Sequence, residues 1–156
     1  MATIEIITFI NNSPEVVFDL SRSIDLHLKS TAKTNEKAVA GVTSGLIGMD
    51  ETVTWEAYHL FKIRRFTSRI TEFNYPLSFT DEMTKGDLKK FTHRHTFERS
   101  GSGTMMKDVI FMTAPYGLLG KFVMKSFLRN YFLQFLRERN KVIKEYAEIK
   151  VNHNIK

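Results

Sequence analysis

Residues 89–113 read KKFTHRHTFERSGSGTMMKDVIFMT, and this stretch decides the fold. Its first half places aromatic rings and imidazoles at alternate positions, namely Phe91, His93, His95 and Phe97. Because the side chains of a β-strand alternate between the two faces of a sheet, this spacing predicts a strand with one half-apolar, titratable face. The Ser-Gly-Ser-Gly sequence that follows favours a chain reversal, so the whole stretch predicts a β-hairpin.

The rest of the sequence extends this hairpin into a larger sheet. Residues 2–10 are rich in β-branched side chains and predict a first strand. Six further segments, separated by residues suited to turns, predict a meander of consecutive antiparallel strands. These segments are residues 37–41, 51–60, 63–73, 76–84, 89–98 and 103–113.

Helical patterns occupy three other segments. Ser13 and Pro14 are the residue types of a helix cap and a first helical position, which predicts a short helix over residues 14–21. Residues 23–31 predict a second short helix, although their alternation also permits a strand. A long amphipathic helix is predicted from about residue 118 or 123 to Tyr146, and its apolar face must pack on the sheet. That face carries Val123, Phe127, Tyr131, Phe135, Leu136, Val142, Ile143 and Tyr146.

Length and composition fit one globular domain. At 156 residues, with 42% hydrophobic and 26% charged residues, the chain predicts a single domain over residues 1–150 and a flexible tail over residues 151–156. Zero cysteines exclude disulfides, thiolate nucleophiles and thiolate metal ligands. The N-terminus lacks the pattern of a secretory signal and no apolar run could span a bilayer, so we expect a cytoplasmic location.

The net charge of +6 raises the question of a polyanionic partner. Many basic residues lie within residues 121–146, where they alternate with apolar residues at helical spacing. Such a pattern is typical of a solvated helix face, and no zinc-ligand, RNA-binding or basic-zipper motif accompanies it. We therefore expect no nucleic-acid partner and no stable membrane insertion, and the charge is compatible with weak contact with an anionic surface.

The order of elements, a strand, two short helices, a six-strand meander and a long helix, resembles the helix-grip fold of the START-like (SRPBCC) superfamily. That superfamily includes pollen-allergen-like proteins, lipid-transfer domains and polyketide cyclases. Four stretches are similar to an uncharacterised bacterial ligand-binding branch: SPEVVFDLSRSIDLHLKS (13–30), VTWEAYHL (53–60), TSRITEFNYPLSFTDEMTKGDLKKFTHRHTFE (67–98) and GTMMKDVIFMTAPYGLLGKF (103–122). The resemblance covers essentially the whole chain. It implies an α+β fold in which a curved antiparallel sheet of about seven strands wraps around the C-terminal helix and encloses a cavity for a hydrophobic ligand.

The Ser-Gly-Ser-Gly turn also predicts the register of its hairpin. If residues 101–102 form a two-residue turn, counting back from it sets His95 opposite Asp108 and Phe97 opposite Met106. Directly opposed residues have Cβ atoms about 4.5–5.5 Å apart, so the imidazole could reach the carboxylate.

The preceding hairpin leads to a similar pair. A three-residue loop over residues 86–88, flanked by paired lysines at 85 and 89, sets His93 opposite Asp81 and Phe91 opposite Met83. The two hairpins together predict two neighbouring His–Asp pairs on the inner face of the sheet.

The same counting of strand faces predicts the wall of a pocket. It is mostly apolar, with a few polar groups, as is usual for a small-molecule site. Besides the two His–Asp pairs, the predicted ligand-binding residues are Trp55, Ala57, His59, Phe66, Ile70, Phe79, Met83, Phe91, Met106 and Ile110 from strands, and Phe127 and Tyr131 from the long helix. Trp55 is also a usual core residue, and His27 and His59 fit ordinary hydrogen-bonded positions at the ends of elements.

Four roles remain open for His93, His95, Asp81 and Asp108. They fit a buried polar network, because an unpaired buried polar group is costly. They also fit, in decreasing order of preference, an anchor for the polar group of a ligand or the acid–base pair of an enzyme. Metal binding is the role least favoured, because alternating residues on adjacent strands need not converge on one ion. We therefore predict no metal and no cofactor.

These observations favour a binding module for a small hydrophobic molecule, as carrier, sensor or sequestering protein, acting as a monomer or weak dimer. The alternative is an enzyme resembling polyketide cyclases, aromatases or dehydratases, with His93 or His95 as acid and base. A protein-interaction domain with a vestigial pocket is a third hypothesis. No phosphate-binding loop, dinucleotide fingerprint or nucleophile elbow occurs, which disfavours nucleotide-dependent and serine-hydrolase chemistry.

Overall fold

The structure is a computed structural model that describes residues 1–59, 61–115, 117–118, 122 and 127–153. Both predicted short helices and all seven predicted strands are present, and the segment that permitted a strand as well is helical. The elements are β1 (Ala2–Ile10), α1 (Pro14–Ser21), α2 (Ile24–Ser30), the 3₁₀ helix η1 (Ala32–Thr34), β2 (Lys37–Gly41), β3 (Thr52–His59), β4 (Lys62–Asn74), β5 (Ser78–Lys85), β6 (Lys90–Ser100), β7 (Gly103–Thr113) and α4 (Arg129–His153).

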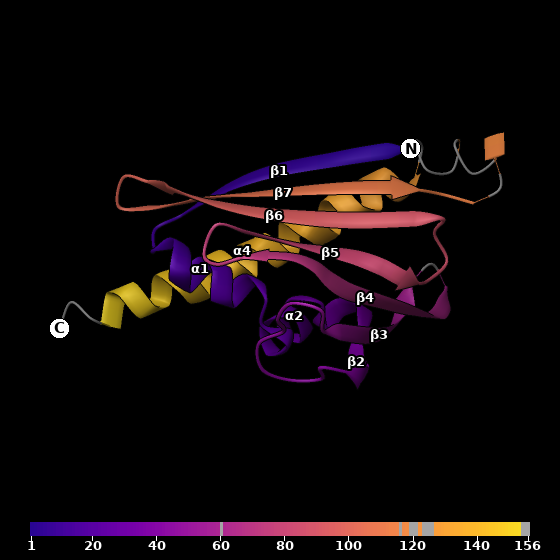
Figure 1. Cartoon of the computed structure of the whole chain (residues 1–156), viewed down its shortest axis with the longest axis horizontal. Coiled ribbons are helices and arrows are strands. Elements are labelled where there is room, and N and C mark those ends of the chain that lie inside the picture. Colours follow the sequence, from indigo (N-terminus) through magenta and orange to yellow (C-terminus); the bar gives the residue numbers. More distant parts are fainter. Residues whose placement is uncertain (60, 116, 119–121, 123–126, 154–156) are drawn as a thin grey trace.

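The seven strands form one antiparallel sheet in the order β1-β7-β6-β5-β4-β3-β2. The expected meander is confirmed, and the first strand pairs with the last. Register shifts between Thr67 and Ser68 and between Ile70 and Glu72 interrupt the pairing of β4 with β5. Because bulges of this kind bend and twist a strand, they help the sheet to curve. In Figure 1, α4 (yellow) runs obliquely across one face of this sheet, with α1 beside it.

Serine side chains begin both short helices. The hydroxyl of Ser13 accepts a hydrogen bond from the backbone N–H of Val16, and that of Ser23 accepts one from Leu26. Each cap satisfies a backbone donor that has no partner within the helix. The predicted helix start at Ser13 is therefore confirmed.

α4 ends later than predicted. It continues through residues 147–153, which contain no glycine or proline to stop a helix, so the expected end at Tyr146 was wrong. The expected boundary between domain and tail, at residue 150, falls inside this helix, and residues 154–156 lie outside the described chain, as does Val123. Within the described ranges, no helix has both the length and the apolar character that crossing a membrane requires.

Hydrogen bonds tie the N-terminal segment to α4. The side-chain amide of Asn12 donates to the carbonyl of Ala147 at 2.8 Å, and Lys144 Nζ donates to the carbonyl of Phe9 at 2.7 Å. The backbone N–H of Asn11 donates to Glu148 at 3.0 Å. The segment that follows β1 is therefore held against the C-terminal part of α4.

Apolar residues form two clusters in the core. One contains Phe18, Phe97, Met106 and Ile143, and the other contains Phe91, Ile110 and Leu136, each with further apolar neighbours. Along β6, β7 and α4, buried polar residues separate the members of the first cluster from those of the second. We call these residues the polar belt, and they are His93, His95, Asp108, Arg139 and Asn140.

Candidate functional site

A cavity of about 450 Å³ opens beside the polar belt and is lined by residues of the sheet, α2 and α4. This volume lies within the range of about 300–1,000 Å³ that small-molecule sites usually have. Exposed lining residues, namely Arg65, Asp87 and Phe127, mark its mouth, and buried ones such as Ile110 and Leu136 mark its floor. Most of the wall between them is apolar.

The predicted strand register is confirmed at the site. His95 lies opposite Asp108 and Phe97 opposite Met106 across β6 and β7, and His93 lies opposite Asp81 across β5 and β6. Burial alternates along β6, with the two histidines facing inward. The predicted pairs Met83–Phe91 and Lys85–Lys89 were wrong, because the ladder between β5 and β6 ends at the pair Glu82–Thr92. The strands separate there, and Lys85 pairs instead with Thr67 of β4.

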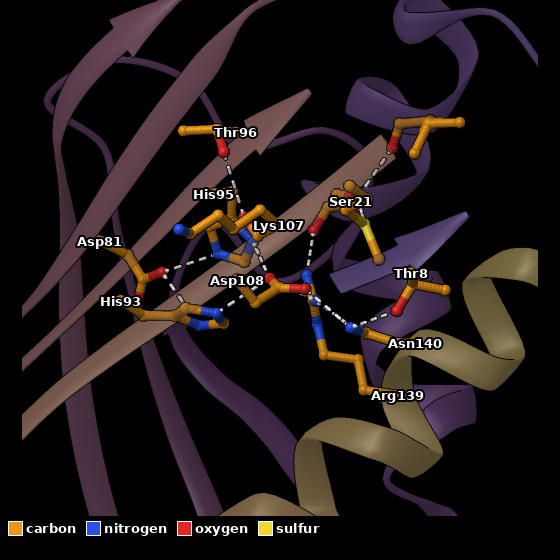
Figure 2. Close-up of polar contacts among 12 residues, drawn as sticks. Thr8, Ser21, Asp81, His93, His95, Thr96, Lys107, Asp108, Arg139 and Asn140 are labelled. Atoms are coloured by element: carbon orange, nitrogen blue, oxygen red, sulfur yellow. Dashed lines mark hydrogen bonds and ion pairs between the residues drawn. The ribbon is translucent and has the colours of Figure 1, made fainter. Parts of the chain in front are cut away.

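Each imidazole contacts both carboxylates, which is a more connected arrangement than two separate pairs. His93 Nε2 lies 3.0 Å from Asp108 Oδ1, and His93 Nδ1 lies 3.8 Å from Asp81 Oδ2. His95 Nε2 lies 3.3 Å from Asp81 Oδ2, and His95 Nδ1 lies 2.7 Å from Asp108 Oδ1. Figure 2 shows Asp108 between the imidazoles and α4, with Asp81 on their other side. A single oxygen of Asp108 therefore faces both rings.

The two rings differ in burial and in hydrogen bonding. The side chain of His93 keeps 10% of its surface exposed, whereas that of His95 keeps 2% and stacks on Phe79 with ring centroids 4.1 Å apart. His95 Nδ1 is buried and makes no hydrogen bond with any described residue, because its contact with Asp108 is close but poorly aligned. Buried ring nitrogens are normally paired, so this one calls for an explanation.

Two residues of α4 complete the site, and the sequence analysis missed both. The amide of Asn140 donates to Asp108 Oδ2 at 2.7 Å, and Arg139 lies 3.7 Å from Asp108 Oδ1 while donating to the carbonyl of Ser21 at 2.7 Å. One indication was available in the sequence. The buried residues of α4 recur as 136, 139, 140, 143 and 147, so Arg139 and Asn140 occupy the centre of the apolar stripe.

Burial and charge set the protonation states of the cluster. Burial, and after it the electrostatic effect of the neighbouring His95, lower the pKa of His93 to about 4, against the opposing effects of Asp108 and Asp81. Burial would raise the pKa of Asp108, but contacts with the two imidazoles hold that pKa well below its usual range. The pKa of Asp81 is also lowered, because contacts with His95 and His93 outweigh burial. Near neutral pH, both carboxylates are ionised and His93 is neutral.

These charges identify the tautomer of His93. An ionised carboxylate can only accept, so Nε2 of His93 must carry the ring proton and donate it to Asp108. Nδ1 is then left with a free lone pair, 3.8 Å from another acceptor, Asp81. His93 lines the cavity and therefore offers this lone pair beside it.

Most of the predicted site residues lie on the cavity wall. These are Trp55, Ala57, Phe66, Ile70, Phe79, Asp81, Phe91, His93, His95, Ile110, Phe127 and Tyr131. Met83, Met106 and Asp108 do not line it, and the side chain of His59 lies outside the described part of the chain. Met106 and Asp108 face inward as predicted, but both are fully buried, since other side chains cover this part of β7.

The cavity wall also carries His27 and Glu36, which were not among the predicted ligand-binding residues. His27 Nε2 lies 3.0 Å from Glu36 Oε2, and its ring lies over Trp55 with centroids 4.2 Å apart. Burial and the charge of Glu36 raise the pKa of Tyr131, which also lines the cavity. His27 thus has the ordinary hydrogen-bonded environment expected of it, although it does line the cavity.

Comparison with solved structures identifies the architecture. TTHA0849 from Thermus thermophilus is similar over 96% of this chain and 99% of its own, with a TM-score of 0.76 and 15% identity. Major latex-like protein 151 from Panax ginseng matches over 94% and 97%, with a TM-score of 0.69 and 13% identity. Ara h 8.0201 matches over the same shares of the two chains, with a TM-score of 0.62 and 14% identity.

The chain has the helix-grip fold. No protein-family model matches it, and the search of curated proteins found no match. At identities of 13–15% the likeness concerns the fold, and function must be argued from the site.

Within this helix-grip fold the site combines an apolar wall with a concentrated set of polar groups. It can exclude water from a small apolar molecule and present a hydrogen-bond acceptor, His93 Nδ1, to that molecule. It also holds a neutral imidazole in one tautomer through a carboxylate, which is the arrangement of a general base. The acceptor lone pair and the fixed tautomer of His93 both depend on Asp108. This residue lies behind the histidines and does not line the cavity.

Proposed function

We propose that the protein binds a small hydrophobic or amphipathic molecule in the cavity between the sheet and α4, as a cytoplasmic carrier, sensor or sequestering module. The observation that carries this proposal is the free lone pair of His93 beside an otherwise mostly apolar cavity. A ligand with an apolar body and one hydroxyl or N–H group would bury the body and donate a hydrogen bond to His93. Apolar burial would supply most of the affinity, at about 25 cal/mol per Å² before the costs of association.

Trp55 makes binding directly measurable. It is the single tryptophan of the chain, it lines the cavity, and it is 8% exposed. A ligand that enters the cavity should therefore change its fluorescence. Native mass spectrometry of the purified protein, followed by extraction, would identify any retained compound. Titration with oleate and with the dye anilinonaphthalene sulfonate would test binding of known probes.

Ala57 provides the decisive variant. It is buried and lines the cavity, so Ala57→Leu should fill space that the ligand needs and weaken probe binding at least tenfold. Glu56→Gln, the neighbouring position on the outer face of β3, is the matched control and should bind as the unchanged protein does. The proposal is overturned if no compound is retained and no probe alters Trp55 fluorescence, or if both variants bind equally well.

Substitution of His93 tests the anchor itself. His93→Gln should weaken a hydroxyl-bearing ligand about fivefold to tenfold, because a net hydrogen bond contributes about 1 kcal/mol. A ligand without a donor group should bind the variant as tightly as it binds the unchanged protein. Equal losses for both ligands would contradict the anchoring role of His93.

The fixed tautomer of His93 also favours one alternative, a cyclase-, aromatase- or dehydratase-like enzyme. In that case His93, oriented by Asp108, would take a proton from the substrate, and His95 with Asp81 would be the second acid–base group. The two functions differ in what the protein releases. A compound recovered unchanged after incubation supports the carrier, whereas conversion that His93→Gln abolishes without loss of binding supports the enzyme.

A further inference from the structure

We propose that Asp81, His93 and His95 form a binding site for one divalent transition-metal ion, with Asp108 as the carboxylate that orients both histidines. The site requires only these side chains. A bound ion would use the Nδ1 lone pair of His93, so the polar group of an organic ligand would then contact the ion in place of that nitrogen. Two histidines and one carboxylate with open positions form a recognised ligand set for first-row metals. The sequence analysis assigned no metal, because it could not show that alternating residues converge.

Distances between the side-chain atoms show that they do converge. Each of the three residues offers one ligand atom, and these atoms lie within 4.8 Å of one another. Asp81 Oδ2 lies 3.3 Å from His95 Nε2 and 3.8 Å from His93 Nδ1. Two ligands of one tetrahedral ion with bonds of about 2.1 Å are roughly 3.4 Å apart. Small side-chain rotations would therefore bring all three atoms to bonding distance.

The position of Asp108 is the second and independent observation. Histidines that bind a metal usually donate the N–H of their other nitrogen to a carboxylate or carbonyl, which fixes the tautomer. Here one oxygen, Asp108 Oδ1, lies 3.0 Å from Nε2 of His93 and 2.7 Å from Nδ1 of His95. The remaining nitrogen of each ring faces Asp81. A single carboxylate thus supports both rings from the side opposite the proposed ion.

A metal ion also accounts for the unpaired nitrogen of His95. In a neutral His95 whose Nε2 proton is donated to Asp81, the lone pair of Nδ1 faces Asp108 at 2.7 Å. With an ion, the lone pair of Nε2 binds the metal and Nδ1 carries the proton toward Asp108. In this second arrangement each ring nitrogen of both histidines has a suitable neighbour, the ion for one nitrogen and Asp108 for the other.

The charges around the site are compatible with a cation. Two carboxylates, those of Asp81 and Asp108, and one guanidinium, that of Arg139, surround the two imidazoles, so acidic groups outnumber permanently basic ones by one. A divalent ion would change this excess to one positive charge, which an anionic group of a bound molecule could then neutralise. All three proposed ligands line the cavity, so the open positions of the ion would face its interior.

Untagged protein, first treated with a chelator and then freed of it, is the material for the test. We expect Zn²⁺ titration by calorimetry to give one saturable site per chain. We expect Co²⁺ to give the visible absorption bands of a four- or five-coordinate site with nitrogen ligands. Neither measurement needs the organic ligand, so failure here and failure of the binding module can be told apart.

Variants locate the ion within the chain. Asp81→Asn and the double substitution His93→Gln/His95→Gln should each abolish the site, whereas Asp108→Asn should weaken Zn²⁺ about 10-fold to 100-fold because it removes the orienting carboxylate. His27→Gln, which changes the other cavity histidine paired with a carboxylate, is the matched control and should leave the affinity unchanged. Circular dichroism and thermal melting of each variant show which ones are folded and can be compared.

Two results would overturn the proposal. The first is the absence of saturable Zn²⁺ and Co²⁺ binding by the folded, chelator-treated protein. The second is Zn²⁺ binding that persists in the folded double variant, because the ion would then be held by other histidines of the chain.

Discussion

The cluster around Phe18 and the wall of the cavity are built from the same kinds of side chain but are packed differently. Phe18 is fully buried, and its ring lies 5.0–5.2 Å from four other rings, those of Phe73, Tyr75, Phe79 and Phe97. We call these five residues the Phe18 cluster. On the cavity wall, aromatic rings such as Trp55 and Phe91 pack on one side and border open space on the other.

The difference follows from where α1 lies. Phe18 projects from α1, which packs against β6, β7 and α4 and thereby fills one end of the space under the sheet. The other end is covered by the N-terminal part of α4 and has no such filling. A protein interior is normally close-packed, so a volume of about 450 Å³ left open among apolar residues forgoes stabilising contacts. The end under α1 is therefore closely packed, and the other end contains the cavity.

Truncation of the central ring gives the largest expected effect. Phe18→Ala should lower the free energy of unfolding by about 3–5 kcal/mol, because it removes a fully buried ring and leaves a void among four others. Phe91→Ala on the cavity wall should cost less, below about 3 kcal/mol, because part of that ring already faces open space. Urea unfolding of both variants measures the difference. Equal losses would mean that the wall is as tightly packed as the cluster.

The polar belt, which borders both regions, should make stability depend on pH. The pKa of His93 is about 4 in the folded protein and near 6.5 when unfolded, so the unfolded chain binds a proton first as the pH falls. The free energy of unfolding should be highest above pH 6.5 and should decrease by about 3 kcal/mol between pH 6.5 and 4. Unfolding measured at several pH values in EDTA checks this, with the metal excluded.

His93→Gln is the control for that measurement, because it removes the titrating group and should flatten the curve in this pH range. Phe18→Ala should lower the curve at every pH and keep its slope. A slope that persists in His93→Gln would assign the pH dependence to other residues.

Enlargement of a buried alanine gives the smallest expected effect and separates the two regions most directly. Ala147 of α4 is fully buried in the same apolar cluster as Phe18, and Ala147→Leu should cost about 1–3 kcal/mol by overpacking. Ala57→Leu extends into the cavity, so it should change the free energy of unfolding by less than about 1 kcal/mol. Thermal melting of the two variants is sufficient. A severe loss in Ala57→Leu would show that the space beside Ala57 is too small for three additional carbons.

The strand faces and register were predictable because both depend on local rules. Alternation fixes which residues of β6 face inward, and the two-residue turn at residues 101–102 fixes their partners on β7. Depth was not predictable in this way. Asp108 and Met106 lie on the same face of the sheet as the cavity residues, yet both are fully buried. Their burial depends on the helix packing over β7, which local rules do not predict.

The contribution of α4 to the site was not predicted for a related reason. Arg139 and Asn140 are polar, so they were not counted in an apolar stripe, although their spacing places them on it. Their burial makes sense only once Asp108 is known to lie opposite, since a buried charge requires a partner. A polar pair at the centre of an apolar helix face is therefore a useful indication of a buried polar group on the facing sheet.

Finally, the hydrogen bonds between residues 9–12 and residues 144–148 join parts of the chain that lie far apart in the sequence. During synthesis, β1 is made well before its strand partner β7 and its helical partner α4. Contacts between such distant parts of a chain slow folding. The apolar inner face of the sheet thus stays uncovered in the nascent chain until α4 has been made and has docked, and only then can the cavity form.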